Sequence, residues 1–226
     1  MSHRPNEYII IVAGGKGLRM QSNLPKQFMV IHDKPILVHT MERFRAYNPE
    51  INIVLAMNPE YIGYWEDLIR TFGFDIPHNI IPGGAERFHS VKNGLESIEA
   101  SQAIVGVHDA VRPLVSIETI SICYQVAREH GNAVPVIQPA DTLRVVSEAG
   151  STTVDRNVYR IVQTPQCFDI TILRKAYLQE YKPSFTDDAS VVEATGEHIH
   201  LVQGNRENIK ITDQEDVHMA SYLLRN

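Results

Sequence analysis

Continuous apolar runs alternate along the chain with longer stretches in which apolar residues recur at helical spacing. The apolar runs occupy residues 8–13, 51–57, 103–108 and 132–137. Short runs of this kind predict strands that are buried on both faces, and the stretches between them predict crossover helices. The alternation is typical of an α/β protein, Rossmann-like in layout, with a mostly parallel sheet and helices on both faces. We expect the loops at the carboxyl ends of the strands to hold the ligand.

Local signals predict where the helices begin. Ser116 is placed to cap one helix, and Thr186 with the two aspartates that follow it opens another. Thr212 and Glu215 have the spacing of a capping box at the start of the last helix.

Residues 140–166 interrupt the alternation of strands and helices. Two short stretches of alternating apolar and polar residues flank a turn-like Glu-Ala-Gly at 148–150, which predicts a protruding β-hairpin. A two-stranded projection buries little apolar surface by itself, so we expect it to pack against a second chain. No repeat or flexible linker is visible. The sequence therefore predicts one domain over 1–226, with residues 140–160 as the dimerisation arm of a homodimer.

Composition restricts the class of protein. Hydrophobic residues make up 43% of the chain and charged residues 21%, as in ordinary globular proteins. The formal net charge of -6 argues against a surface that binds nucleic acid or an anionic membrane. The apolar stretch at 8–13 is far shorter than the ~20 residues of a membrane helix, so we expect a cytoplasmic protein. Cys123 and Cys167 lack the spacing of a redox or metal motif, which predicts buried, unreactive thiols.

The strongest chemical signal directly follows the first predicted strand, in the segment AGGKGLRMQSNLPKQF at 13–28. Its glycines allow backbone N–H groups to lie close to phosphate oxygens, and its basic side chains supply positive charge. The segment matches neither GxxxxGK[ST] nor GxGxxG, so we interpret it as a different anion-binding loop. An ordinary turn with solvated bases is the alternative. The glycines are Gly14, Gly15 and Gly17, and the bases are Lys16, Arg19 and Lys26.

Further polar residues follow later strands. Gly83 and Gly84 permit close backbone approach to the polar edge of a base, and Ser90 adds a hydroxyl. Asp109 and Arg112 follow a buried strand and place a carboxylate beside a guanidinium. A loop with a helix cap and a structural ion pair are the respective alternatives.

These segments together resemble the sugar-phosphate nucleotidyltransferases, specifically the 2-C-methyl-D-erythritol 4-phosphate cytidylyltransferases of isoprenoid precursor synthesis. The resemblance begins with LRM at 18–20 and LPKQF at 24–28 and spans nearly the whole chain. The further blocks, in order, are GGAERFHSV (83–91), VHDAVRP (107–113), ADTLR (140–144), TVDRN (153–157), QTPQCF (163–168), FTDDAS (185–190) and ENIKIT (207–212). One departure is Ala85, where some relatives have an acidic residue. The resemblance implies that backbone groups read cytosine there, so this change is tolerable.

The resemblance implies a magnesium-dependent transfer of the cytidylyl group from CTP to a polyol phosphate, 2-C-methyl-D-erythritol 4-phosphate, with release of pyrophosphate. The attacking phosphate is already anionic, so the protein must align two anions that repel each other and neutralise the charge that develops. No covalent intermediate is indicated. We expect magnesium to bridge the phosphates with few or no protein ligands.

The resemblance also implies roles for individual residues. Catalytic roles fall to Arg19, Lys26 and Lys210, the last of which lies in a predicted NIKI strand. The nucleotide-binding set is Ala13, Gly14, Gly15, Gly17, Gly83, Gly84, Ala85, Ser90, Asp109 and Ala110. The substrate-binding set is Asp109, Arg112, Thr142, Arg156, Thr164 and Thr186. Thr142 and Arg156 are expected to act in the partner subunit's pocket. The alternatives are a helix cap at Thr186 and a surface arginine on an exposed arm at 156.

Three other functions stay open at this point. Ribitol 5-phosphate cytidylyltransferases share the loop and the HDxVRP block, although DRN at 155–157 and ENIKIT favour the methylerythritol acceptor. A dinucleotide oxidoreductase would need the third glycine of its fingerprint. A nucleotide sensor without activity would not need Lys26, Arg19 and Lys210 together.

Overall fold

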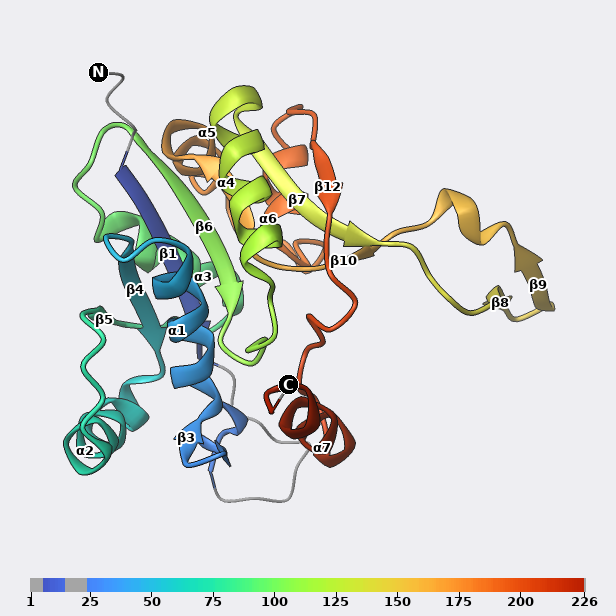
Figure 1. Cartoon of the computed structure of the whole chain (residues 1–226). Coiled ribbons are helices and arrows are strands. Elements are labelled where there is room, and N and C mark those ends of the chain that lie inside the picture. Colours follow the sequence, from blue (N-terminus) through green and yellow to red (C-terminus); the bar gives the residue numbers. More distant parts are fainter. Residues whose placement is uncertain (1–5, 15–23, 226) are drawn as a thin grey trace.

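An eight-stranded sheet forms the centre of the protein, in a computed structural model that describes residues 6–14 and 24–225. Its order is β10-β7-β11-β6-β1-β4-β5, with β12 paired to β7 (Figure 1). The neighbours β6, β1, β4 and β5 are parallel, whereas β11 runs antiparallel to β6 and β7. The strands are β1 (Asn6–Ala13), β4 (Asn52–Met57), β5 (Asn79–Pro82), β6 (Ala103–Asp109), β7 (Asn132–Ile137), β10 (Ile161–Val162), β11 (Gln166–Asp169) and β12 (Leu201–Gln203).

Helices cover both faces of this sheet, as the sequence predicts. The helices are α1 (Ile36–Tyr47), α2 (Ile62–Phe72), α3 (Arg87–Glu96), α4 (Ile117–His130), α5 (Ile170–Ala176), α6 (Asp188–Glu193) and α7 (Gln214–Leu223). Short 3-10 turns occur at η2 (Lys26–Phe28), η3 (Pro59–Tyr61) and η4 (Arg156–Val158). The small strands β2 (Val30–Ile31) and β3 (Lys34–Pro35) pair with each other near α1. Within the described ranges, no helix is long and apolar enough to cross a membrane.

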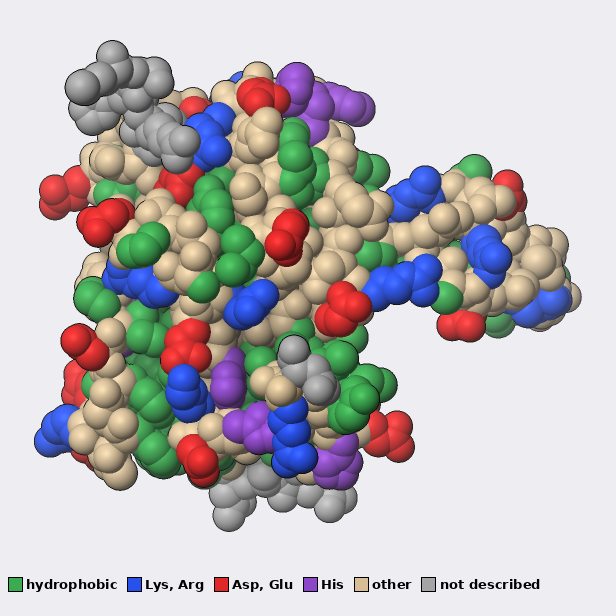
Figure 2. Space-filling view, in the orientation of Figure 1, with side chains coloured by type: hydrophobic (Ala, Val, Ile, Leu, Met, Phe, Trp, Pro, Cys, Tyr) green, Lys and Arg blue, Asp and Glu red, His purple; other side chains and the backbone are tan. Residues whose placement is uncertain are grey.

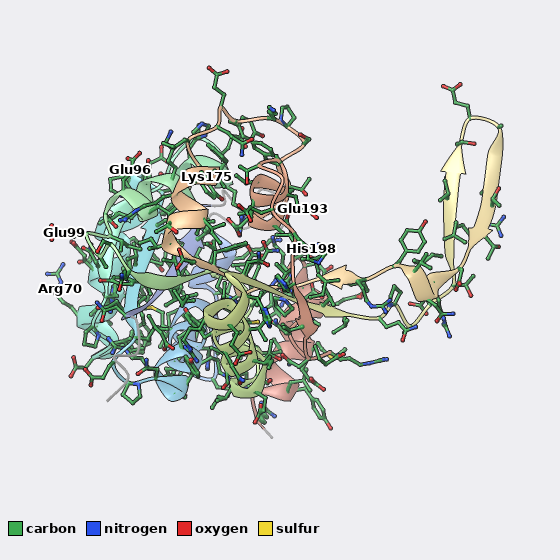
Figure 3. The ribbon with its side chains drawn as sticks, turned by 90° about the horizontal axis from the view of Figure 1, so that it is seen from above. Arg70, Glu96, Glu99, Lys175, Glu193 and His198 are labelled. Atoms are coloured by element: carbon green, nitrogen blue, oxygen red, sulfur yellow. The ribbon has the colours of Figure 1, made fainter. Side chains whose placement is uncertain are left out.

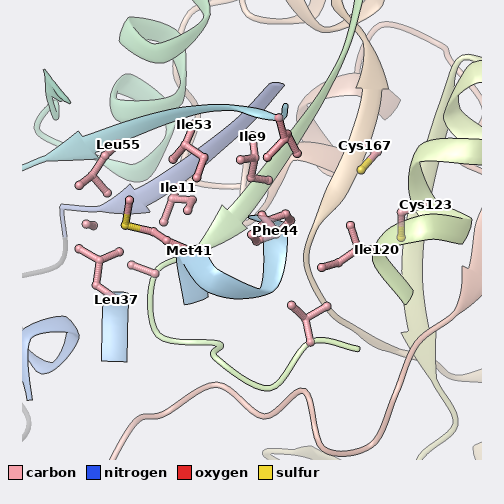
Figure 4. Close-up of a cluster of buried hydrophobic side chains, with 14 of the residues drawn as sticks. Ile9, Ile11, Leu37, Met41, Phe44, Ile53, Leu55, Ile120, Cys123 and Cys167 are labelled. Carbon is pink, nitrogen blue, oxygen red and sulfur yellow. The ribbon is translucent and has the colours of Figure 1, made fainter. Parts of the chain in front are cut away.

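The apolar runs are continuous because the central strands pack against a hydrophobic core on each of their two faces. Ile9 and Ile11 of β1 pack with α1, α2 and α4 on one face, as Figure 4 shows for α1 and α4, whereas Ile10 packs with α3, α5 and α6 on the other. Side chains of a strand alternate between its faces, so a strand covered on both sides needs apolar residues at every position. Cys123 and Cys167 lie buried in the first core, and burial raises the pKa of Cys167 above its ordinary value, as expected of an unreactive thiol.

The helix starts agree with the sequence at α4 and α6 and differ by one residue at α7. Ser116 caps α4, where its hydroxyl accepts from the N–H of Thr119 at 3.0 Å. The capping box predicted at Thr212 and Glu215 is wrong by one residue. Asp213 and Asp216 form the box, because each carboxylate accepts from the backbone N–H of the other residue. Helix α6 opens in the predicted segment 186–188 with Asp187 as its cap, so the helix cap considered as an alternative role for Thr186 is wrong.

The predicted hairpin is present as β8 (Leu143–Ser147) and β9 (Gly150–Val154), an antiparallel pair separate from the main sheet. In Figures 1 and 3 it projects from the end of β7, away from the body of the protein that carries the labelled Glu96, Lys175 and Glu193. Hydrophobic, basic and acidic side chains lie at its surface (Figure 2). The hairpin prediction is confirmed, and its role in dimerisation stays a prediction.

Candidate active site

A cavity of about 680 Å³ opens where the parallel strands end, as the α/β pattern predicts. It brings together segments that lie far apart in the sequence: the ends of β1 and β6, the loop between β5 and α3, and the chain before α7. The predicted site residues in its wall are Ala13, Gly14, Gly83, Gly84, Ala85, Ser90, Asp109, Ala110 and Lys210. The predictions at Gly15, Gly17 and Arg19 lie outside the described residues.

The loop before α3 is held close to the helix. The N–H of Gly83 donates to the carbonyl of Met57 at 2.7 Å, and the N–H of Gly84 donates to the buried hydroxyl of Ser90 at 3.0 Å. A Cβ atom at Gly84 would lie 2.2 Å from Cβ of His89, so this approach requires glycine. The helix cap is Glu86, so Ser90 is not the N-cap that the sequence left as an alternative. The loop thus presents a fixed backbone edge to the cavity.

Asp109 lies at the end of β6 with three basic side chains around it. Lys210 Nζ lies 3.0 Å and Arg112 Nε 3.3 Å from Oδ2, and Arg87 Nε lies 3.5 Å from Oδ1. Burial alone would raise the pKa of Asp109, but Arg87, Lys210 and Arg112 outweigh burial and hold that pKa well below its usual range. The group is therefore a carboxylate at neutral pH. The ion pair predicted between Asp109 and Arg112 is present, within a larger cluster than the sequence indicated.

Arg87 is a site residue that sequence reasoning missed. It lines the cavity, and its Nη2 donates to the fully buried Asp188 at 2.7 Å. Both residues lie in the blocks that carried the resemblance, at 83–91 and 185–190, which was the available signal. Their contact joins positions 101 residues apart, and nothing in residue type or spacing reveals such a pair.

Lys26 and Lys210, the two predicted catalytic lysines, both lie at the segment that precedes α7. Lys26 lies on η2, where its Nζ donates to the carbonyl oxygen of Thr212. Thr212 is two residues beyond Lys210, whose side chain is 47% exposed at the cavity. The NIKI strand predicted around Lys210 is absent: residues 208–211 have no strand pairing, although the N–H of Ile211 donates to the carbonyl of Val111 at 3.0 Å. The alternating pattern there reflects the burial of Ile211 beside α7.

Thr164 lies buried behind Asp109. Its hydroxyl accepts from the N–H of Asp109 at 3.2 Å and lies 2.9 Å from Nδ1 of His108. Nε2 of His108 lies 3.1 Å from the carbonyl oxygen of Arg112, so we assign the proton to Nε2. Nδ1 then accepts from the Thr164 hydroxyl. Burial lowers the pKa of His108 to about 4, which leaves the ring neutral at pH 7. Thr164 therefore supports the backbone of the site, and its contact with substrate stays a prediction.

The remaining substrate-binding residues are not in the wall of this cavity. Thr186 is exposed just before α6. Thr142 and Arg156 are exposed on the hairpin arm, where Arg156 donates to the carbonyl oxygen of Ala140 in its own chain. Their predicted roles thus depend on substrate binding or on a second subunit.

The fold and the cavity define an α/β protein whose main cavity lies at the carboxyl ends of parallel strands. This is the class of the nucleotide-binding α/β enzymes.

Comparison with known proteins narrows this class. The family model "IspD: 2-C-methyl-D-erythritol 4-phosphate cytidylyltransferase" matches residues 8–226. The 2-C-methyl-D-erythritol 4-phosphate cytidylyltransferase of Bacteroides thetaiotaomicron is 51% identical over 216 residues, which cover 96% of this chain and 98% of that protein. Its Bacteroides fragilis counterpart is 52% identical over 215 residues, 95% of this chain and 98% of that protein. The crystal structure of 4-diphosphocytidyl-2C-methyl-D-erythritol synthase from Anaerococcus prevotii is 26% identical, with a TM-score of 0.82 and coverage of 98% and 97%. The chain belongs to the 2-C-methyl-D-erythritol 4-phosphate cytidylyltransferase family.

Proposed function

We propose that the chain transfers the cytidylyl group of CTP to 2-C-methyl-D-erythritol 4-phosphate, giving 4-diphosphocytidyl-2-C-methyl-D-erythritol and pyrophosphate. This is a step of the non-mevalonate route to isoprenoid precursors. The observation that carries the proposal is membership of the family over residues 8–226. The cavity supports it, because it combines a fixed backbone edge for a base with basic side chains for phosphates. Neither the family match nor the cavity favours ribitol 5-phosphate as the acceptor.

The reaction is an in-line displacement at the α-phosphorus of CTP. A phosphate oxygen of the acceptor forms the new P–O bond, and the bond to the β-phosphate breaks as pyrophosphate leaves. Arg19 and Lys26 neutralise the charge that develops on the α-phosphate and the bridging oxygen, and Lys210 acts from the opposite side. The contact of Lys26 with Thr212, two residues from Lys210, supports placing the two lysines in one site. The loop at Gly83 and Gly84 reads the base through its backbone.

Magnesium would be held in this site mainly by the nucleotide. Within the described ranges, no group of three or more His, Cys, Asp or Glu side chains is arranged to hold a metal ion. The carboxylate of Asp109 already faces three basic side chains. Triphosphate oxygens would supply ligands to the ion, and its positive charge would help the anionic acceptor approach the nucleotide.

We also propose that two chains share each site through the hairpin arm. The arm exposes large apolar side chains: 54% of Val145, 78% of Val146 and 75% of Val158 are accessible to solvent. A second chain would cover this surface, and Thr142 and Arg156 of the first chain would then lie at the cavity of the second. The planar guanidinium of Arg156 suits two-point binding of the acceptor phosphate. A single domain over 1–226 and a cytoplasmic location remain predictions from the sequence.

A comparison of acceptors tests the proposed function. Release of pyrophosphate is measured with CTP, magnesium and either 2-C-methyl-D-erythritol 4-phosphate or ribitol 5-phosphate. We expect kcat/KM to favour the methylerythritol acceptor by at least about tenfold, since one altered pocket contact changes specificity by ~1–3 kcal/mol. A preference for ribitol 5-phosphate would replace the proposed acceptor.

A further inference from the structure

Asp188 is a buried carboxylate that lies outside the cavity wall and serves two donors. Its side chain is 0% exposed at the start of α6. The hydroxyl of Tyr177 donates to Oδ1 at 2.6 Å, and Nη2 of Arg87 donates to Oδ2 at 2.7 Å. A buried charge is costly unless it is paired and hydrogen-bonded, and here both oxygens are satisfied. Asp188 therefore holds its partners in one arrangement.

The guanidinium of Arg87 links this buried carboxylate to the cavity. Nη2 is held by Asp188, and Nε lies 3.5 Å from Oδ1 of Asp109. The guanidinium is planar and rigid, so holding Nη2 on Asp188 restricts the directions in which Nε can face Asp109. Oδ2 of Asp109 is meanwhile held by Arg112 and Lys210. The position of Asp109 is thus set from two sides, and Lys210 depends on it.

The charges of this cluster do not cancel. Three positive side chains (Arg87, Arg112 and Lys210) face two carboxylates (Asp109 and Asp188), so the net charge of the five is one positive. Lys210 is the most exposed of the cations, at 47% against 26% for Arg87 and 13% for Arg112. Lys210 is paired with Asp109 and is also the cation of the cluster that an anion in the cavity can reach most easily.

We propose that Asp188 is a positioning residue for the reaction, which acts through Arg87 to hold Asp109 and thereby Lys210 in place at the cavity. The proposal rests on the proposed function, because Lys210 is assigned there to the reacting phosphates. A purely structural role, in which the pair only ties α3 to α6, makes a different prediction. It would change stability without a selective change in catalysis.

The Asp188→Asn variant separates these two roles. The amide has nearly the volume of the carboxylate but offers one acceptor oxygen to two donors and carries no charge for Arg87. We expect kcat/KM for the acceptor to fall by about tenfold to a hundredfold, because a small displacement of a group that positions the substrate lowers the rate by factors of this size. The Kd of CTP, whose base is read by the loop before α3, should change by less than about threefold. Tyr177→Phe keeps the stacking on Phe88 and the Arg87 pair, so as the matched control it should keep kcat/KM within about threefold.

A double-mutant cycle tests whether Asp188 acts through Arg87. Arg87→Lys keeps the positive charge but cannot reach both carboxylates at once, so it should lose about tenfold or more by itself. Adding Asp188→Asn to it should cost less than a further threefold, because residues that act through each other are not additive. Unfolding by urea is measured on each variant in parallel.

Three results would overturn the proposal: full activity in folded Asp188→Asn, an equal loss from Asp188→Asn in both backgrounds, or a loss in Tyr177→Phe as large as that in Asp188→Asn. If Asp188→Asn does not fold, Arg87→Lys provides the test. Wild-type activity in Arg87→Lys would refute the proposal that Asp188 acts through Arg87. Failure of the proposed function is a separate result, because the wild type would then release no pyrophosphate with the methylerythritol acceptor. The cycle would be run with whichever acceptor the wild type uses.

Discussion

Acid should destabilise the protein through His108, a fully buried ring behind the cavity. Burial lowers the pKa of this histidine to about 4, whereas an exposed histidine in the unfolded chain has a pKa near 6.5. Between these two values the unfolded chain binds a proton that the folded chain does not. Stability therefore falls as the pH falls through this window and is fully present above it.

The expected loss follows from the difference between the two pKa values. That difference corresponds to roughly 3 kcal/mol of unfolding free energy when the pH is lowered from 7 to about 4. A domain is stable by only about 5–15 kcal/mol, so the effect is measurable. Asp109 adds little to the pH dependence above pH 4, because its stabilisation is present above the pKa of an unfolded aspartate, about 3.9, and is lost only below it. Burial also lowers the pKa of His39, so the histidine at 108 must be isolated by a variant.

Urea unfolding at several pH values, in the wild type and in His108→Gln, provides this comparison. The glutamine amide can still donate to the carbonyl of Arg112 but does not titrate. The variant should be less stable at pH 7, and its free energy of unfolding should fall by about 2–3 kcal/mol less than that of the wild type between pH 7 and 4.5. Parallel pH dependences in the two proteins would refute the assignment of a neutral, buried ring.

Three further predictions concern the reaction. Lys26→Ala should lower kcat by roughly 10²–10³ with a modest change in CTP affinity, as expected of a charge interaction made mainly in the transition state. A large loss of CTP affinity with kcat preserved would instead show that Lys26 binds the ground state. CTP should be preferred over UTP, because the fixed backbone at Gly83 and Gly84 would leave polar groups unpaired against the wrong base, and comparable turnover of UTP would contradict this reading. Re-paired mixtures of the inactive variants Arg156→Ala and Lys26→Ala should recover activity in about a quarter of all sites, because about half of the dimers are mixed and each has one intact site. An inactive mixture would show that Arg156 acts within its own chain.

The sequence predicts the framework of the fold because the framework depends on local periodicity. The run at 8–13 is apolar at every position because β1 is buried on both faces, and a cavity at the carboxyl ends of parallel strands follows from the topology. The hairpin was visible for the same reason, since its alternating stretches flank a turn-forming tripeptide.

The cavity's charge network was not predictable in the same way. The pair of Arg87 and Asp188 depends on how α3 and α6 meet, and no short-range pattern encodes that contact. Around Lys210 the alternation of apolar and polar residues indicated a strand, yet the segment has no neighbouring strand to pair with. At the start of α7, threonine and aspartate are both good caps. Asp213 is the cap, because it accepts from the N–H of Asp216, whose carboxylate in turn accepts from the N–H of Thr212.

The most direct test of the proposed reaction follows both products of one turnover by ³¹P NMR. CTP, magnesium and 2-C-methyl-D-erythritol 4-phosphate are mixed with the protein, and a sample with excess EDTA serves as the control. The proposed function predicts that a diphosphate diester and free pyrophosphate appear in equal amounts while the monoester signal of the acceptor disappears, and that EDTA prevents all three changes. Loss of CTP without the diester, or no change in the presence of magnesium, would contradict cytidylyl transfer to this acceptor.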